Sequence, residues 1–300
     1  MKKSNSYKVF LFFNFIFMMF IVIVMLFPYL NIIAKSFNDG ADTMKGGLTV
    51  YPRIFTLENF KTLMKDNSLI SAAEVSVLRV ITGVVLTLLV QFAAAYALTK
   101  NFRGKSIALT LYMIPMFVSA GQMPTYVLFS KMGLLNNFWV YILPSLFSFY
   151  NVIIIRTFLQ NTIPASLEES AIIDGAGELT VFSKIILPLS KPILATIALW
   201  TMVMHWNDYT TTLLYIRKPG LYTLQYKMME LVKESERLQS IIAAARENGE
   251  AVDETLLNQM PTSEGITAAQ IVLTTLPIIC VYPFLQKYFV KGIMAGSIKG

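Results

Sequence analysis

Residues 9–34 read VFLFFNFIFMMFIVIVMLFPYLNIIA, a run without one charged side chain, and Lys2, Lys3 and Lys8 precede it. A helix needs about 20 apolar residues to cross the hydrocarbon core of a bilayer. The run is longer than the apolar core of a secretory signal, roughly 7–15 residues, and no A-x-A cleavage pattern follows it. We therefore expect this segment to be a retained membrane-spanning helix.

The composition of the whole chain points the same way. Of its 300 residues 55% are hydrophobic and 14% are charged, whereas soluble proteins carry about 25% charged residues. The segments that are apolar and long enough to cross a bilayer are 9–34, 70–99, 106–130, 138–160, 185–206 and 266–289. The sequence thus predicts an all-α, polytopic membrane protein with six transmembrane helices in a single domain over residues 1–300. Pro188 and Pro192 predict a bend or a late start in the fifth helix.

The distribution of charge predicts the orientation in the membrane. With the N-terminus inside, the inner side holds twelve basic and four acidic residues, and the outer loops hold twelve basic and thirteen acidic residues. Glu74 and Arg79, near the start of the second segment, are left out because they cancel. Cytoplasmic loops carry an excess of Lys and Arg, so we expect both termini in the cytoplasm. Topology then explains the net charge of +7, and no nucleic-acid partner is expected.

Few residues offer chemistry of their own. Cys280 and His205 are the single cysteine and histidine, so neither an internal disulfide nor a Cys- or His-rich metal site is possible. The Gly104-Lys-Ser106 stretch ends like a phosphate-binding loop, but Thr99 stands where that motif needs a glycine. His205 beside Asp208 is better explained as a hydrogen-bonded interfacial residue than as a proton relay. We predict no catalytic residue, no metal site and no ATP binding by this chain.

Three polar stretches separate the apolar segments, at about 35–69, 161–184 and 207–265. The last contains an insertion, about 233–265, that is acidic and has helical spacing (Leu238, Ile241, Ile242, Ala245). It is interpreted either as a solvated amphipathic hairpin or as a docking surface for another protein.

The cytoplasmic stretch 161–184 predicts a helix–turn–helix at the membrane surface. Pro164 suits a first helical turn, while Ser166 and Glu169 have capping-box spacing, which leaves the start open by two residues. Gly175 can end the first helix by taking a positive φ, and a second short helix is expected from about Glu178 to Ile186. Acids beside an apolar stripe suit a docking surface for a cytosolic partner; a simple interfacial linker is the alternative.

The same stretch resembles the EAA loop of bacterial ATP-binding-cassette (ABC) importer permeases, whose pattern is E-A-A-x3-G-x9-I-x-L-P. The matching residues are Glu169, Ala171, Gly175, Ile185, Leu187 and Pro188. Ser170 replaces the first alanine, which exchanges one small residue for another.

Other stretches extend the resemblance over nearly the whole chain. They are residues 56–60, 94–98, 163–176, 206–208 and the C-terminal 289–300. Together they are similar to the maltose-type, binding-protein-dependent sugar permeases, above all to the branch that handles aldouronates and other complex oligosaccharides. The insertion at about 233–265, within the expected extracellular stretch 207–265, departs from the compact maltose pattern, and as a docking surface it would contact the sugar-binding protein.

The resemblance implies an ABC importer permease of the maltose-type fold in the bacterial plasma membrane, a non-catalytic subunit that forms half of the pathway for an oligosaccharide. Its implied partners are a homologous second permease, a cytosolic ABC ATPase dimer that holds ATP and Mg, an extracellular sugar-binding lipoprotein and membrane lipid. Glu169 would pair with a basic residue of the ATPase, and Gly175 would permit the turn between the coupling helices. The implied coupling residues also include Ser170, Ala171, Asp174, Ile185, Leu187 and Pro188, and the tail residues Lys299 and Gly300 would reach the ATPase dimer interface.

Polar residues within the apolar segments are candidates to line the pathway: Gln91, Gln122, Tyr126, Asn151 and Gln270. Interhelical hydrogen bonds, or packing in the case of the tyrosine, are the alternative for each of them. Ion-coupled transport needs ionisable groups at the bilayer midplane, which most of the segments lack. Import of a non-sugar solute, and a membrane scaffold or enzyme that recruits a cytosolic partner, remain the competing functions.

Overall fold

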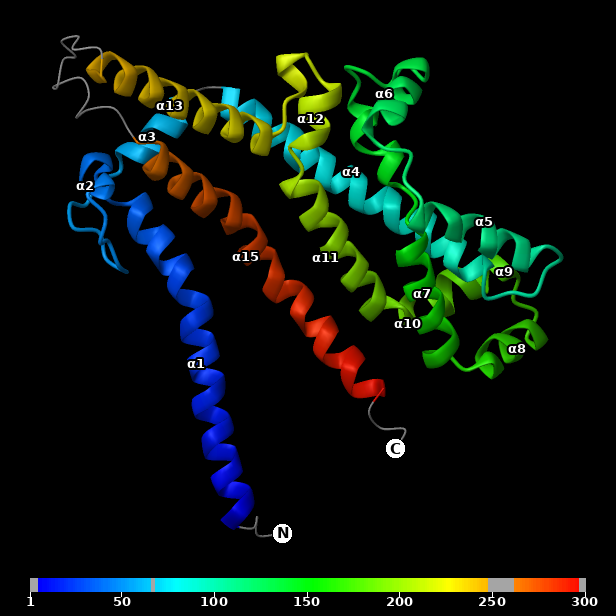
Figure 1. The fold of residues 1–300 in the computed structure, drawn as a ribbon. Helices are drawn as coiled ribbons and strands as arrows, with labels where there is room; N and C mark the ends of the chain where they lie inside the picture. Colours follow the sequence, from blue (N-terminus) through cyan, green and yellow to red (C-terminus); the bar gives the residue numbers. More distant parts are fainter. Residues whose placement is uncertain (1–4, 66–67, 248–261, 297–300) are drawn as a thin grey trace. The chain divides into compact units, whose positions relative to one another are not determined.

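The computed structural model describes residues 5–65, 68–247 and 262–296, and the described part is built of helices (Figure 1). This confirms the all-α class predicted from the sequence. The α-helices are α1 (Asn5–Ser36), α2 (Gly40–Met44), α3 (Glu58–Met64), α4 (Ser68–Ala97), α5 (Lys105–Phe117), α6 (Gln122–Lys131), α7 (Phe149–Thr162), α8 (Ala165–Ile173), α9 (Glu178–Val181), α10 (Leu187–Leu189), α11 (Lys191–Asn207), α12 (Thr210–Tyr215), α13 (Leu224–Glu247) and α15 (Ser263–Gly296). Short 3-10 turns cover Phe138–Tyr141 (η1), Leu143–Ser145 (η2) and Pro219–Leu221 (η4), and Phe182–Ile186 (η3) is π-helical.

The described helices include three that are long and apolar enough to cross a membrane unbroken: residues 7–36, 68–97 and 263–284. Three further candidates are bent pairs: α5 with α6 (118°), the 138–145 turns with α7 (49°), and residues 178–189 with α11 (76°). Six spans result if each bent pair is one span.

The bends have local causes in the sequence. Between α5 and α6 the chain is extended at Val118, and Gly121 has a φ of 84°, which a residue with a side chain rarely adopts. The segment predicted as one helix over 106–130 is therefore two helices. The bend before α11 falls at Ser190, between Pro188 and Pro192, where the two prolines predict it.

The chain divides into two compact units, residues 1–69 with 228–277 and residues 70–227 with 278–300. In the first unit, α1 is apolar on all sides and its spanning window buries none of its residues, which suits contact with lipid or with another subunit. After α1 the chain forms a network of hydrogen bonds around the buried Asn38. Its amide nitrogen donates to Asp42 (3.0 Å) and Thr43 (2.9 Å), and its amide oxygen accepts from the Ile54 N–H (2.9 Å).

The first part of the insertion at about 233–265 lies in a helix that starts before it, α13. α13 includes Leu238 and Ile241, both of which are exposed. The remainder of the insertion, residues 248–261, lies outside the described residues, as do the tail residues Lys299 and Gly300.

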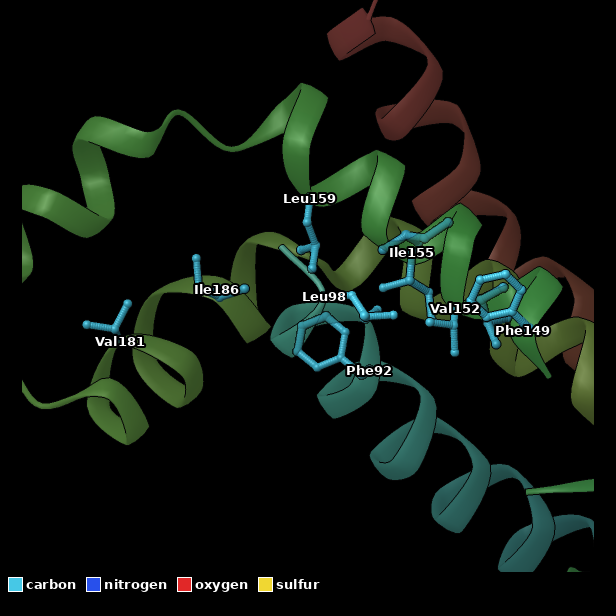
Figure 2. Close-up of a cluster of buried hydrophobic side chains, with 11 residues drawn as sticks. Phe92, Leu98, Phe149, Val152, Ile155, Leu159, Val181 and Ile186 are labelled. Carbon is cyan, nitrogen blue, oxygen red and sulfur yellow. The ribbon is translucent and has the colours of Figure 1, made fainter. Parts of the chain in front are cut away.

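The core of the second unit lies where α4, α7, the 178–186 segment and α11 meet. Figure 2 shows Phe92 of α4 and Leu98, just after α4, pointing toward the side chains of α7, with Val181 and Ile186 on the neighbouring segment. The buried members of this core cluster are Phe92, Ala95, Leu98, Phe149, Val152, Ile155, Leu159, Val181, Ile186, Ile193 and Ile197. The core cluster thus ties the EAA-like loop to the membrane helices.

Candidate coupling site

The EAA-like loop folds as two short helices joined by a tight turn. α8 starts at Ala165 with Pro164 as its N-cap and has no side-chain cap bond, so the Ser166–Glu169 capping box does not form. At its end the Gly175 N–H donates to the Ile172 carbonyl (3.0 Å) and the Ala176 N–H to the Ala171 carbonyl (2.9 Å). This is a Schellman cap, and Gly175 takes the φ of 84° that it requires. The A-x3-G spacing of the loop therefore places a glycine where the helix must end.

The turn presents apolar and acidic side chains to the surroundings. Ile173 on one side of the turn is 85% exposed, and Leu179 on the other side is 83% exposed. Glu169 and Asp174 are exposed as well. Large apolar side chains left in solvent beside charges are typical of a protein-binding surface. We call the surface formed by Glu169, Ile172, Ile173, Asp174 and Leu179 the coupling tip.

The opposite side of the loop is fixed to the core cluster. Val181 and Ile186 are buried in it, and Ala171, Ala176, Phe182 and Ile185 pack against it. The Phe182 ring lies 5.2 Å from the ring of Phe92 and 5.2 Å from that of Tyr96, measured between centroids. The second half of the loop is thus held to α4 by apolar packing.

The first half of the loop is held by a polar anchor. Glu168 of α8 accepts a hydrogen bond from the Tyr96 hydroxyl (2.6 Å) and forms an ion pair with Lys100. The Lys100 ammonium also lies 4.8 Å from the centroid of the Tyr96 ring. The predicted site residues did not include Glu168, because nothing in the motif indicates which of two adjacent glutamates faces the protein.

A cavity of about 320 Å³ lies beside this anchor. It is lined by Tyr96, Thr99, Lys100, Leu159, Gln160, Ile163, Pro164, Ala165, Glu168 and Ile186. Ala165 and Glu168 of α8 border this cavity, while Ala171 of the same helix packs against the core cluster without being fully buried.

The other predicted loop residues divide between the two sides. Ser170 is exposed and Ala171 half-buried, while Ile185 is half-buried near the end of the π-helical turn. Leu187 and Pro188 begin α10, and both are exposed.

The predicted pathway residues have different surroundings. Gln91 of α4 is fully buried, and its amide donates to the carbonyl of Leu146 (3.2 Å), in the loop between η2 and α7. Gln122 is exposed at the start of α6, and Tyr126 on the same helix stacks on Tyr215 at 5.9 Å. Asn151 is half-buried in α7. Gln270, in α15, belongs to the other unit and is half-buried.

A second polar cluster, which the sequence did not indicate, joins α4 to the segment after α11. The Arg79 guanidinium forms an ion pair with the Asp208 carboxylate and donates to the Asp208 carbonyl (3.0 Å). It also lies 4.5 Å from the centroid of the Tyr141 ring. Burial of the Asp208 carboxyl favours its neutral form, but Arg79 and hydrogen bonds from Thr211 outweigh this effect and lower the pKa of Asp208.

His205, at the end of α11, lies in the same region and is 1% exposed. Its ring is close to Ser145 (Nε2 to Oγ, 3.5 Å) and rests against Gly83 of α4. The ring is therefore buried within the unit and has a hydrogen-bond partner in Ser145. Among the described residues, no group of three or more His, Cys, Asp or Glu side chains could hold a metal ion.

Comparison with known proteins gives one consistent result. Residues 99–295 match the family described as "binding-protein-dependent transport system inner membrane component". The protein LplC of Bacillus subtilis (strain 168) is 37% identical over 100% of this chain and 98% of its own length. The polygalacturonan/rhamnogalacturonan transport system permease protein YtcP of the same organism is 33% identical over 95% of this chain and 96% of its own.

The fold agrees with a solved structure as well. The crystal structure of a bacterial ABC transporter involved in the import of the acidic polysaccharide alginate contains a chain that superposes with a TM-score of 0.79. The two chains are 26% identical, and the match covers 96% of this chain and 99% of that one. With its helical architecture, its EAA-like loop and these relatives, the chain belongs to the family of binding-protein-dependent transport system inner membrane components.

Proposed function

We propose that this chain is the permease subunit of an ATP-driven, binding-protein-dependent importer of oligosaccharides, and that it forms half of the translocation pathway. Family membership supports the transport role. The carbohydrate cargo is supported by similarity to a polygalacturonan/rhamnogalacturonan permease and to an alginate importer. A homologous permease supplies the other half of the pathway, an extracellular sugar-binding lipoprotein delivers the cargo, and both termini lie in the cytoplasm of a bacterial cell.

The coupling tip carries the proposal. Ile173 and Leu179 stand almost fully exposed on a loop whose other side is buried in the core. Leaving such side chains in water costs about 1.5–3 kcal/mol each relative to burial, so the tip favours a cytosolic partner with an apolar cleft. An ABC ATPase dimer fits this role, with Glu169 facing a basic residue of the cleft. ATP and Mg belong to that ATPase, and this subunit is non-catalytic.

Two surfaces suit the remaining partners. The uniformly apolar α1 has no buried window and can contact lipid or the second permease. The tail residues Lys299 and Gly300 are assigned to the ATPase dimer interface by resemblance alone.

Purification of the chain from its native membrane tests the assembly. We expect an ATPase, a second permease and a sugar-binding lipoprotein to copurify. Glu169→Lys should insert normally but lose the ATPase and sugar uptake, because it reverses a charge on the coupling tip. Glu236→Lys is the matched control, since it makes the same charge change at an exposed position of α13; it should retain the ATPase.

Two results would contradict the proposal. Purification without an ATPase under conditions that preserve such complexes would favour a scaffold or an enzyme. A lipoprotein that binds no saccharide in a screen of oligosaccharides would leave the importer but change the class of its cargo.

A further inference from the structure

Two adjacent glutamates of α8 face different surroundings. Successive residues of an α-helix are rotated by about 100°, so neighbours cannot share one face. Glu169 is exposed on the coupling tip, whereas the Glu168 side chain is 22% exposed and bound to residues of and just after α4. The motif glutamate and its neighbour therefore have different tasks.

The anchor formed by Glu168, Tyr96 and Lys100 is the polar attachment of α8 to α4. The Tyr96 hydroxyl and the Lys100 ammonium both bind one carboxylate oxygen of Glu168. Tyr96 is in the last turn of α4, and Lys100 lies in the turn that follows it. The position of α8 is thus tied to the end of α4, which the charge distribution places at the cytoplasmic side.

This attachment differs from that of the second coupling helix. Val181 is buried, and the Phe182 ring contacts the rings of Phe92 and Tyr96 in α4, so apolar packing holds that half of the loop. α8 has no fully buried residue, packs Ala171 against the core cluster and borders the cavity of about 320 Å³. A helix with open space beside it and few buried side chains can shift with less repacking than a fully packed one.

We infer that Glu168 is a positioning residue that carries displacement of the coupling tip to α4. The inference rests on the proposed function, since the displacement comes from the ATPase bound at the tip. Through Glu168, movement of α8 pulls on Tyr96 and Lys100 and hence on the end of α4. Without this anchor the tip can still bind the ATPase, but α8 moves into the adjacent cavity and the end of α4 does not move with it.

The test uses the complete importer, purified with its ATPase and binding protein and reconstituted in vesicles. Glu168→Gln keeps the shape of the side chain and removes the charge. It should retain the ATPase and lower the number of sugars imported per ATP hydrolysed, because displacement of the tip no longer reaches the end of α4. Tyr96→Phe, which keeps the ring and the charge pair, should lower this ratio less.

Charge exchange separates transmission from simple stability. Glu168→Lys and Lys100→Glu should each lower the ratio, and the double variant should restore it, because the pair is re-formed in reverse. Glu169→Gln is the matched neighbour: it should weaken ATPase retention rather than the import ratio of the complexes that remain. Thermal unfolding of each variant should stay close to that of the unchanged protein, as the pair is half-exposed.

The outcomes distinguish this inference from the proposed function. If Glu168→Gln retains the ATPase and imports as many sugars per ATP as the unchanged protein, the inference is wrong and the proposed function stands. A double variant as defective as Glu168→Lys alone would also overturn it. If the unchanged chain binds no ATPase, the proposed function fails and the inference fails with it.

Discussion

Two ion pairs fix α4 to other parts of its unit, and they differ in burial. At Arg79 the side chain is 3% exposed, and the guanidinium binds both the carboxylate and the backbone carbonyl of Asp208. At Lys100 the side chain is 31% exposed, and the ammonium binds one oxygen of Glu168. Arg79 lies within α4, and Lys100 lies in the turn just after it, 21 positions further along the sequence.

The difference in burial separates a fixed attachment from one that can be released. A buried guanidinium that loses its partner remains charged away from water, which is strongly unfavourable. A half-exposed ammonium that loses its partner is solvated by water, so the pair contributes little to stability. We expect α4 to stay in place near Arg79, while its C-terminal end, next to Lys100, can follow the coupling loop.

The largest expected effect is at the buried pair. Arg79→Ala leaves Asp208 without its cation and should lower the free energy of unfolding by about 3–5 kcal/mol. The measurement is thermal or denaturant unfolding in detergent. Adding Asp208→Asn should cost less than the sum of the two single changes, because the second substitution removes the unpaired charge. Strict additivity would mean that the two side chains do not stabilise each other.

The two ion pairs also show which contacts cannot be predicted from the sequence. Arg79 and Asp208 are 129 residues apart, and Glu168 and Lys100 are 68 apart. Such pairings follow from how helices pack, which residue types alone do not specify. Sequence reasoning placed Arg79 with Glu74 as cancelling charges near a helix start, and the structure instead places Arg79 in the core of its unit.

Local features were predictable because their causes are local. Long apolar runs predict a helical membrane protein, Pro188 and Pro192 predict the bend before α11, and Gly175 predicts the end of α8. The break within 106–130 was missed, since it depends on the positive φ of Gly121, and a single glycine is also tolerated in membrane helices.

Substitutions at two glycines should have intermediate effects on stability, and they compare the packing of α4 near Arg79 with that of the coupling loop. A Cβ at Gly83 of α4 would come within 3.0 Å of three atoms of the His205 ring, whereas one at Gly175 would meet nothing within 4 Å. Gly83→Ala should therefore lower the free energy of unfolding by about 1–3 kcal/mol through overpacking near the buried pair. Gly175→Ala should cost only about 1 kcal/mol, through its positive φ. Equal unfolding midpoints for the two variants would contradict the tight packing of α4 near Arg79.

The smallest expected effect on stability is at the half-exposed pair. Lys100→Ala should change the free energy of unfolding by less than about 1 kcal/mol, and the unchanged protein should lose this small contribution in high salt, where surface charges are screened. Unfolding in low and high salt measures both. A loss as large as that of Arg79→Ala would mean that the anchor of α8 is a fixed structural element. A small loss of unfolding free energy together with a low number of sugars imported per ATP would mean that the pair transmits movement rather than stabilises the fold. Water can solvate Lys100 in place of Glu168, but it cannot transmit movement of α8 to α4.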